Sequence, residues 1–343
     1  MRLFFSCIAG LILGSAPVVF SYANTVQKEP ALDENYYGVT ILDERAWIVG
    51  YYGTILHSQD RGLTWEIQRS PSRSALYSVR FVTPDKGWIS GSYGTLLQTK
   101  DGGKNWTAMP SGTTEHLFSL TWPDSRNGWA AGSRGVILRT EDGGGSWADS
   151  SVKEDLAFSS VSFVNPRRGW IAGEFGVIFH TQDGGKSWVK QRSPVEVTFS
   201  SGESRNLFAL LFPDAITGFA VGIDGFILRT QGGANWRIMR QKTLGAKSLS
   251  ANHLFAAATS KNRLWTVGER GTILQADRAG ENWQAVKAAI PPVSLNSIAF
   301  GKNGFGLIVG NRGSVLRTDN GGTAWRPLTN HALAPRMDSR RLP

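Results

Sequence analysis

The sequence predicts an all-β fold, a seven-bladed β-propeller built from four-stranded blades with Asp-box turns. Three observations carry this prediction: one phrase recurs seven times, each copy holds four short β segments, and no segment shows a helical period of useful length. The clearest copy reads GWISGSYGTLLQTKDGGKNW, from Gly87 to Trp106. A recurrence at a period of about forty residues indicates repeated structural units that stack on one another.

Every copy closes on a tryptophan, and a second large apolar residue stands upstream of it. The closing residues are Trp65, Trp106, Trp147, Trp188, Trp236, Trp283 and Trp325, at intervals of 41, 41, 41, 48, 47 and 42 residues. The upstream residues are Trp47, Trp88, Trp129, Trp170, Phe219, Trp265 and Leu307. Large aromatic side chains in register bury much apolar surface, so we expect both sets to pack the core.

The four β segments of a copy follow one another in a set order, as the second copy shows. They are LYSVRF, GWISG, TLLQT and NWTAM, between Leu76 and Met109, with turn-forming residues between them. A four-stranded sheet repeated seven times closes into a propeller, which leaves only short, protected edges. One slot of the first segment is small, as expected where innermost strands crowd around an axis: Ser78, Ser119, Ser160, Ala209 and Ser297.

The turn before the closing tryptophan follows the Asp-box pattern, S/T-x-D-x-G-x-x-W. The pattern is intact in the first four copies, whose aspartates are Asp60, Asp101, Asp142 and Asp183. A hydroxyl and a carboxylate two residues apart can bond the free backbone N–H groups of a tight turn, while glycine accepts a positive φ. We therefore predict that these aspartates are structural braces of their turns.

The Asp-box weakens in the last three copies. The fifth copy lacks a carboxylate, the sixth has Arg278 where the aspartate is expected, and the seventh has Asn320. A turn brace can be lost from single blades, whereas a catalytic acid cannot. Four carboxylates on separate blades would also have to converge on one reacting centre. The sequence therefore predicts no catalytic residues here.

The N-terminus has the features of a targeting segment. Arg2 precedes an apolar run from Leu3 to Phe20, and Ser21-Tyr22-Ala23 offers the small residues that signal peptidase reads. We expect residues 1–23 to be a signal peptide cleaved after Ala23, and the protein to be periplasmic or otherwise exported, on the lumenal side of a membrane. The alternative is an uncleaved anchor, which small residues and a proline in a barely sufficient run make weaker. The only cysteine, Cys7, lies in this segment, so the mature chain would form no disulfide.

The rest of the chain reads as one propeller domain, residues 27–330, followed by a flexible basic tail, residues 331–343. Seven full sets of strands fit between Asn35 and Thr329, which leaves open whether the two ends of the ring exchange a strand. The formal charge is +10, which favours acidic partners or anionic surfaces. Nucleic acid is excluded as the expected partner, because no nucleic-acid-binding module is recognisable and an exported protein seldom meets it. A monomer is expected.

The turns between the second and third segments emerge on the rim opposite the Asp-boxes, and this rim combines aromatic and arginine residues. Such side chains anchor protein interfaces, because they supply large contact areas or forked donors at modest entropic cost. We predict a partner-binding rim formed by Tyr52, Tyr93, Arg134, Phe175, Arg270, Arg312, Arg139, Arg229 and Arg317. The last three share one repeated slot of the third segments.

The repeat GWxxGxxGxILxTxDGGxxW resembles that of the photosystem II stability/assembly factor-like β-propellers, a family of Asp-box (BNR) repeat proteins. The matching positions are Gly87-Trp88, Gly91, Gly94 and Asp101 to Trp106, with their counterparts in the other copies. The resemblance implies a non-enzymatic scaffold that binds a membrane-protein complex or its precursor and aids its assembly or stability. In family members from photosynthetic organisms, the client is a photosystem II precursor. The family's repeat residues carry scaffold roles and no catalytic role.

The alternative function is that of an Asp-box glycosidase or a sialidase-like glycan-binding protein. Candidate acids for such an enzyme are Glu174, Glu203, Asp224 and Glu269. However, the Arg-Ile-Pro signature of sialidases is missing, and sialidases resemble six-bladed rings. No His, Cys, Asp and Glu cluster has metal-ligand spacing, and we expect no metal, no cofactor and no small-molecule substrate. The scaffold accounts for the repeated features better than an enzyme does.

Overall fold

The computed structural model describes residues 34–201, 203, 205–239 and 252–328. The predicted signal peptide, residues 1–23, and the predicted basic tail, residues 331–343, lie outside this part. Across the described ranges, no helix combines the length and apolar character needed to cross a membrane.

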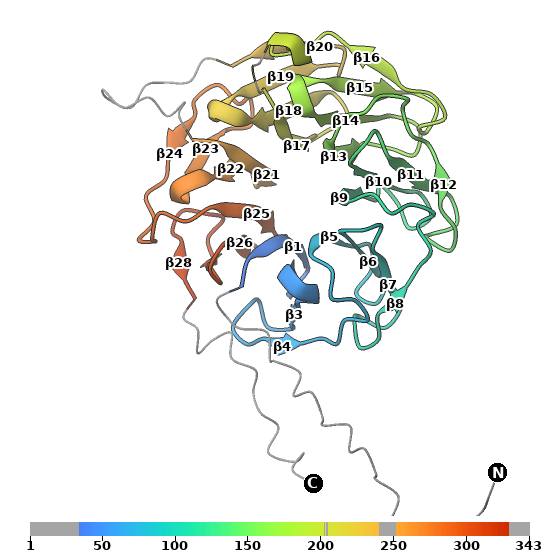
Figure 1. Ribbon diagram of the computed structural model, residues 1–343. Coiled ribbons are helices and arrows are strands. Elements are labelled where there is room, and N and C mark those ends of the chain that lie inside the picture. Colours follow the sequence, from blue (N-terminus) through green and yellow to red (C-terminus); the bar gives the residue numbers. More distant parts are fainter. Residues whose placement is uncertain (1–33, 202, 204, 240–251, 329–343) are drawn as a thin grey trace, which may run out of the picture. The chain divides into compact units, whose positions relative to one another are not determined.

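The described strands form seven sheets of four strands each, and every sheet is an antiparallel meander of strands consecutive in the chain (Figure 1). Blade 1 contains β1 (Tyr36–Leu42), β2 (Arg45–Gly50), β3 (Ile55–Ser58) and β4 (Glu66–Ile67). Blade 2 contains β5 (Leu76–Phe81), β6 (Gly87–Gly91), β7 (Leu96–Thr99) and β8 (Thr107–Ala108). Blade 3 contains β9 (Leu117–Thr121), β10 (Gly128–Gly132), β11 (Ile137–Thr140) and β12 (Ala148–Asp149). Blade 4 contains β13 (Phe158–Phe163), β14 (Gly169–Gly173), β15 (Ile178–Thr181) and β16 (Val189–Gln191).

The remaining three blades repeat this order. Blade 5 contains β17 (Leu207–Leu211), β18 (Thr217–Gly222), β19 (Ile227–Gln231) and β20 (Asn235–Ile238). Blade 6 contains β21 (Leu254–Ser260), β22 (Arg263–Gly268), β23 (Ile273–Asp277) and β24 (Gln284–Ala285). Blade 7 contains β25 (Leu295–Phe300), β26 (Gly306–Gly310), β27 (Val315–Thr318) and β28 (Arg326–Pro327). Short helical turns lie at η1 (Tyr51–Gly53), η2 (Glu174–Gly176), η3 (Phe199–Ser201), η4 (Ile223–Gly225) and η6 (Glu269–Gly271).

The first strand of each blade lies innermost in the ring, and the fourth lies at the outside (Figure 1). The core is divided into seven apolar clusters, and each cluster joins two neighbouring blades. The predicted seven-bladed propeller of four-stranded blades is therefore confirmed. Because both faces of a blade pack on its neighbours, no blade has a core of its own.

Tryptophans of the second strands supply much of this packing between blades. Trp47 of blade 1 stacks on Phe81 of blade 2, with ring centroids 3.6 Å apart, and Trp129 of blade 3 stacks on Phe163 of blade 4 at the same distance. Trp170 stacks in the same way on Phe212, at 4.0 Å. All three tryptophans are buried. The large apolar residues of the second strands therefore pack as predicted, and they join each blade to the next one.

Serines of the small first-strand slot tie neighbouring blades together by hydrogen bonds. The backbone N–H of Leu120 donates to Ser78 Oγ at 3.3 Å, and that of Leu210 donates to Ser160 Oγ at 3.0 Å. The slot therefore has a polar role beyond the small volume that its position requires. Blades 5 and 6 have Ala209 and Ala256 in this slot and lack the hydroxyl.

Blades 7 and 1 close the ring through side chains and backbone groups. The backbone N–H of Val39 donates to Ser297 Oγ at 3.3 Å, and Asn296 Nδ2 donates to the carbonyl oxygen of Tyr36 at 2.8 Å. Phe305 and Leu307 of the seventh repeat pack in one cluster with strands of blade 1. Every described sheet consists of four consecutive strands, so closure within the described residues involves no exchanged strand.

Candidate functional site

The Asp-box aspartates make the hydrogen bonds that a turn brace requires, as blade 4 illustrates. Thr181 Oγ1 donates to Asp183 Oδ1 at 2.8 Å and accepts from the backbone N–H of Gly185 at 2.9 Å. The N–H and hydroxyl of Ser187 donate to the two oxygens of Asp183, at 2.9 and 2.6 Å. These hydrogen bonds, first that of the Ser187 hydroxyl, lower the pKa of Asp183 to about 2.

The same network recurs at the other three intact Asp-boxes, with Asp60, Asp101 and Asp142 as acceptors. The pKa of each of these carboxyls also lies below its ordinary value. At Asp101 and Asp142 the main cause is donation from Asn105 and from Ser146, respectively. An ionised carboxylate whose oxygens are occupied in its own turn is poorly suited to donate a proton as a general acid.

Two of the weakened turns keep a substitute brace. In blade 7, Asn320 Oδ1 accepts from Thr318 Oγ1 at 2.9 Å and from the N–H of Ala324 at 3.0 Å, so an amide oxygen replaces the carboxylate. In blade 6, the sequence prediction identified Arg278 as the residue in the aspartate slot and missed the neighbouring carboxylate. Asp277 accepts there from Asn282 Nδ2 at 2.9 Å. The carboxylate of blade 6 therefore stands one residue before its regular slot, whereas Gly280 keeps its place three residues before Trp283.

The turns between the second and third strands place one residue of every blade at a tip, which is exposed in six blades and half-buried in blade 4. We name these residues the hairpin tips, and they are Tyr52, Tyr93, Arg134, Phe175, Asp224, Arg270 and Arg312. All seven have φ between 51° and 55°, and each precedes a glycine that also has a positive φ. Two consecutive left-handed residues form a type I′ turn, which joins twisted strands tightly. Left-handed backbone is unfavourable for residues other than glycine, so the ring holds seven strained positions on one face.

Neighbouring blades hold several of these tips in place. The N–H of Tyr93 donates to His116 Nδ1 of blade 3 at 3.3 Å, and the N–H of Phe175 donates to Asn206 Oδ1 at 3.2 Å. The N–H of Asp224 likewise donates to His253 Nδ1 at 3.1 Å. Because the acceptor is always on the blade that follows, the tips are fixed relative to the ring. The hairpin tips are therefore a rigid display of side chains.

Six of the tip residues are exposed to a partner, and Phe175 is half-buried. Tyr52 is 53% exposed and Tyr93 is 75% exposed, and the Arg134 and Arg270 side chains are each 73% exposed. Both of these guanidinium groups lie 3.9 Å from a carboxylate, those of Glu115 and Glu269 respectively, and an exposed pair of this kind is weak. Arg312 forms no ion pair with any of the described residues.

The structure does not bring Arg139, Arg229 and Arg317 to the hairpin tips. Each lies one residue before the threonine of an Asp-box or its counterpart, at the opposite end of a third strand of four or five residues. Each also has a local carboxylate: Arg139 pairs with Glu141, Arg229 with Glu281 at 3.4 Å, and Arg317 with Asp319 at 2.7 Å. It was therefore wrong to group these arginines with the hairpin tips, because they lie at the end of the third strand that is farther from the hairpin.

The first strands contain a feature that the sequence prediction missed. In every blade the pairing between the first and second strands is shifted by one residue near the tip end, which is a β-bulge. The bulge residues are Tyr37, Tyr77, Phe118, Ser159, Phe208, Phe255 and Asn296, all of them half-buried. Five of the seven are aromatic. In these five blades, an aromatic residue directly follows the buried residue that begins the first strand. This aligned position is the sequence signal that could have identified the bulge.

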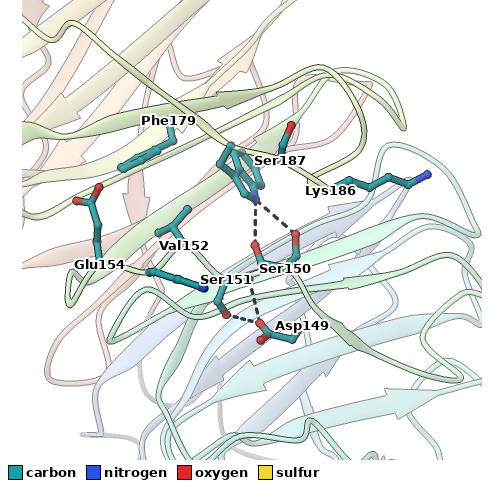
Figure 2. A pocket seen from close by; sticks show the side chains of 10 residues that line it. Asp149, Ser150, Ser151, Val152, Glu154, Phe179, Lys186 and Ser187 are labelled. Carbon is teal, nitrogen blue, oxygen red and sulfur yellow. Dashed lines mark hydrogen bonds between the residues drawn. The ribbon is translucent and has the colours of Figure 1, made fainter.

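A cavity of about 480 Å³ lies between blades 3 and 4 (Figure 2). Asp149, Ser150 and Ser151 line one side of it, and Phe179 and Trp188 of blade 4 lie opposite. The indole N–H of Trp188 donates to the carbonyl oxygen of Ser150 at 3.1 Å, and Ser151 donates to Asp149. These bonds, first that of the Ser151 hydroxyl, lower the pKa of Asp149. Asp149, Ser150 and Ser151 are thus engaged with neighbouring groups of the cavity wall.

Each candidate acid of a glycosidase has a local partner. Glu174 Oε2 accepts from the N–H of Ala157 at 2.7 Å, Glu203 pairs with Arg205 at 2.8 Å, and Asp224 lies 3.8 Å from His253 Nδ1. Glu269 faces Arg270 in blade 6. The described residues also contain no group of three His, Cys, Asp or Glu side chains that could hold a metal ion.

Solved structures with a similar fold include members of one assembly-factor family and an enzyme. A structure of YCF48 from Cyanidioschyzon merolae is 19% identical, covers 85% of this chain and 97% of its own, and has a TM-score of 0.66. A structure of YCF48 bound to a D1 peptide is 21% identical, covers 83% of this chain and 91% of its own, and also has a TM-score of 0.66. An ancestral GH74 enzyme is 14% identical, covers 86% of this chain and 46% of its own, and has a TM-score of 0.67. At these identities the likenesses show the fold.

The family comparison goes further than the structural one. No curated protein sequence matches the chain. The family model described as "Photosynthesis system II assembly factor YCF48" matches residues 20–100, 64–116, 100–201 and 195–341. These segments together span the repeats and most of the chain, so this protein belongs to the family of the photosynthesis system II assembly factor YCF48.

Proposed function

We propose that this protein is a non-enzymatic scaffold, which binds a membrane-protein complex or its precursor through the hairpin tips and aids its assembly or stability. The observation that carries the proposal is the rigid display of seven tips on one face, three of them arginines and three aromatic. A relative of the same fold is bound to a D1 peptide, which supports a polypeptide as the ligand here.

Charge favours an acidic surface on the partner. The chain has a formal charge of +10, and Arg134, Arg270 and Arg312 extend from the tips of three separate blades. Widely spaced cations on a rigid frame attract an acidic surface at long range and then fix its orientation. The signal peptide predicted at residues 1–23 would bring the protein to the exported side of a membrane, where such a client exposes its loops and termini.

A non-enzymatic role agrees with the state of the carboxylates. The Asp-box carboxylates are occupied in their turns, and the candidate acids on the tip face are distributed over separate blades. Glycoside hydrolysis needs two carboxyl groups that flank one bond, with one of them protonated.

The proposal can be tested by cross-linking the tagged protein in its own cells, recovering it from membrane fractions and identifying its partners by mass spectrometry. The test variant carries Arg134→Glu, Arg270→Glu and Arg312→Glu. The control carries Lys100→Glu, Lys104→Glu and Lys186→Glu, which make the same change of charge at exposed positions of the Asp-box turns. We expect one membrane complex to be recovered with the wild type and the control and lost with the test variant. Equal recovery with both variants, at unchanged thermal stability, would contradict the proposal.

A further inference from the structure

We propose that five aromatic rings on blades 1 to 3 form an anchoring site for a partner polypeptide. The segment of the partner that binds there contains an aromatic or branched apolar residue next to acidic residues. We name these rings the aromatic crescent: Tyr37, Tyr77, Tyr93, His116 and Phe118. The inference rests on the proposed function and deepens it, because it assigns the partner's anchoring contacts to one sector of the ring.

The crescent is continuous through its ring contacts. Tyr77 lies 5.7 Å from Tyr37 and 5.6 Å from Phe118, measured between ring centroids. His116 lies 5.0 Å from Tyr93 and 6.0 Å from Phe118. Three of these residues occupy the bulges of three successive first strands, and Tyr93 is a hairpin tip. The crescent thus extends from the inner strands of the ring out to its tips.

The β-bulges explain why these rings are half-exposed. A bulge adds one residue to a strand, so that the side chains no longer alternate regularly between the two faces of the sheet. Bulges are common beside binding sites. The residues on either side of Tyr77, Leu76 and Ser78, are buried, whereas Tyr77 itself is not. The bulge positions of blades 4 and 7 hold Ser159 and Asn296, so the bulge itself does not require an aromatic side chain. The fold therefore does not require the aromatic side chains at the bulges of blades 1 to 3.

A cavity adjoins the outer end of the crescent. It has a volume of about 680 Å³ and is lined by Tyr93, Met109, Pro110 and the segment from Ser111 to Glu115. Tyr93 is the most exposed large hydrophobic side chain of the described residues, at 75%. The walls of this cavity are partly polar, and Ser111 Oγ donates to the carbonyl oxygen of Thr113 within them. Beside an exposed ring, such a cavity suits a peptide whose large side chain packs on Tyr93 and Met109.

The charges around the crescent select for acidic residues on the occupant. Arg134 stands at the tip beyond His116, and its side chain is 73% exposed. Arg80 does not add to the charge at the tips, because it pairs with Trp88 in the same register as Arg139 with Trp129, towards the Asp-box end of its strand.

The nearest carboxylate offsets this cation only in part. Glu115 accepts a hydrogen bond from Ser133 Oγ at 2.7 Å and lies 3.9 Å from Arg134 Nε. Its charge is therefore partly engaged within the protein. A carboxylate of the occupant can bind the exposed guanidinium of Arg134, and the formal charge of +10 on the chain makes acidic residues beside the apolar anchor the complementary choice.

The chain offers a matched pair of variants for the test. The crescent variant carries Tyr77→Ser and Phe118→Ser, which copy the bulge residue Ser159 of blade 4. The control carries Phe208→Ser and Phe255→Ser, which change the same slot in blades 5 and 6, where the two rings lie 5.4 Å apart. Thermal melting of both variants verifies that the propeller is folded.

The probe is a phage-displayed library of random linear peptides, selected on the full-length protein. We expect the enriched peptides to place an aromatic or branched apolar residue next to Asp or Glu. Synthetic copies should lose at least about tenfold in affinity for the crescent variant and less than about twofold for the control. Failure to enrich such peptides, or an equal loss in both variants, would overturn the inference.

Further outcomes separate this inference from the proposed function. If the peptides or the natural client respond only to the Arg134, Arg270 and Arg312 variant, the crescent is not the anchor, while the proposed function stands. If the crescent variant instead loses binding to phosphatidylcholine vesicles that contain phosphatidylglycerol, the surface binds a membrane and the inference is wrong. If it abolishes self-association in solution, the occupant is a second copy of the chain and the inference is equally wrong.

Discussion

The indole N–H of Trp170 in blade 4 donates a hydrogen bond to the carbonyl oxygen of Gly233, 2.9 Å away in blade 5. Trp129 makes the same bond to Gly184 of blade 4 at 3.0 Å. Trp47 donates in the same way to Gly102 of blade 2 at 3.4 Å. In blades 2, 4 and 5, the turn before the closing tryptophan therefore accepts a donor from the preceding blade. Even the fifth copy, which lacks its aspartate, keeps this role.

A methyl group at Gly233 should strongly destabilise the ring. Gly233 has a φ of +74°, and a Cβ there would lie 2.1 Å from the ring of Trp170. The neighbouring Gly232 has a φ of +78° but nothing within 4 Å of its Cβ position. We expect Gly232→Ala to lower the free energy of unfolding by about 1 kcal/mol through backbone strain, and Gly233→Ala by about 2 to 4 kcal/mol through strain and overpacking. Chemical denaturation measures both; equal losses would contradict the docking role of the turn.

Removing the carboxylate of an Asp-box should weaken its turn. Asp183→Ala leaves the N–H and hydroxyl of Ser187 without their acceptor and should lower the free energy of unfolding by about 1 to 2 kcal/mol. Asp183→Asn should cost less, because Asn320 shows that an amide oxygen can accept the corresponding bonds in blade 7. If the alanine variant melts like the wild type, Asp183 is not a brace.

The same carboxylate predicts a dependence of stability on pH. The pKa of Asp183 is about 2 in the folded protein, below its ordinary value of 3.8. A lowered pKa means that the ionised form stabilises the fold, so this contribution is complete above about pH 4 and is lost as the pH falls towards 2. The stability curve of Asp183→Asn should therefore fall less steeply between pH 4 and pH 2 than that of the wild type. Parallel curves over this window would show that Asp183 contributes nothing to acid unfolding.

The serine contacts between first strands should contribute individually to stability. Ser160 Oγ accepts from the N–H of Leu210 at 3.0 Å, and both groups are buried. Ser160→Ala should lower the free energy of unfolding by about 1 kcal/mol, because a buried N–H loses its acceptor. The natural Ala256 in the same slot of blade 6 indicates that the substitution is compatible with the fold. Thermal unfolding identical to the wild type would assign Ser160 to packing alone.

The repeat made most of the fold predictable from the sequence. The predicted segments Leu76 to Phe81 and Gly87 to Gly91 coincide with β5 and β6, because Gly and Asp turns bound them clearly. The fourth strand is shorter than predicted: β8 contains only Thr107–Ala108, since Asn105 is used by the Asp-box turn, where its side chain donates to Asp101.

The candidate site was less predictable, for physical reasons. The tips follow from the repeat, because a glycine after each tip marks the turn. The bulges depend on which backbone groups pair across two strands, and residue types alone do not determine this. Arg139 was grouped with the tips because it shares a repeated slot of the third segments with Arg229 and Arg317, although Thr140 of the Asp-box follows it directly. The observed register, in which Arg139 pairs with Trp129, places it at the Asp-box end of its strand.

Whether the hairpin tips contact the client is the central claim, and site-specific photo-cross-linking tests it most directly. A photoreactive amino acid is placed at Arg134 or Arg312 on the tip face, or at Lys104 in an Asp-box turn, and cross-linked proteins are identified by mass spectrometry. The account predicts that the two tip positions capture the same membrane protein and that Lys104 captures none of it. Capture from Lys104 with none from Arg134 or Arg312 would place the client on the Asp-box face and contradict the account.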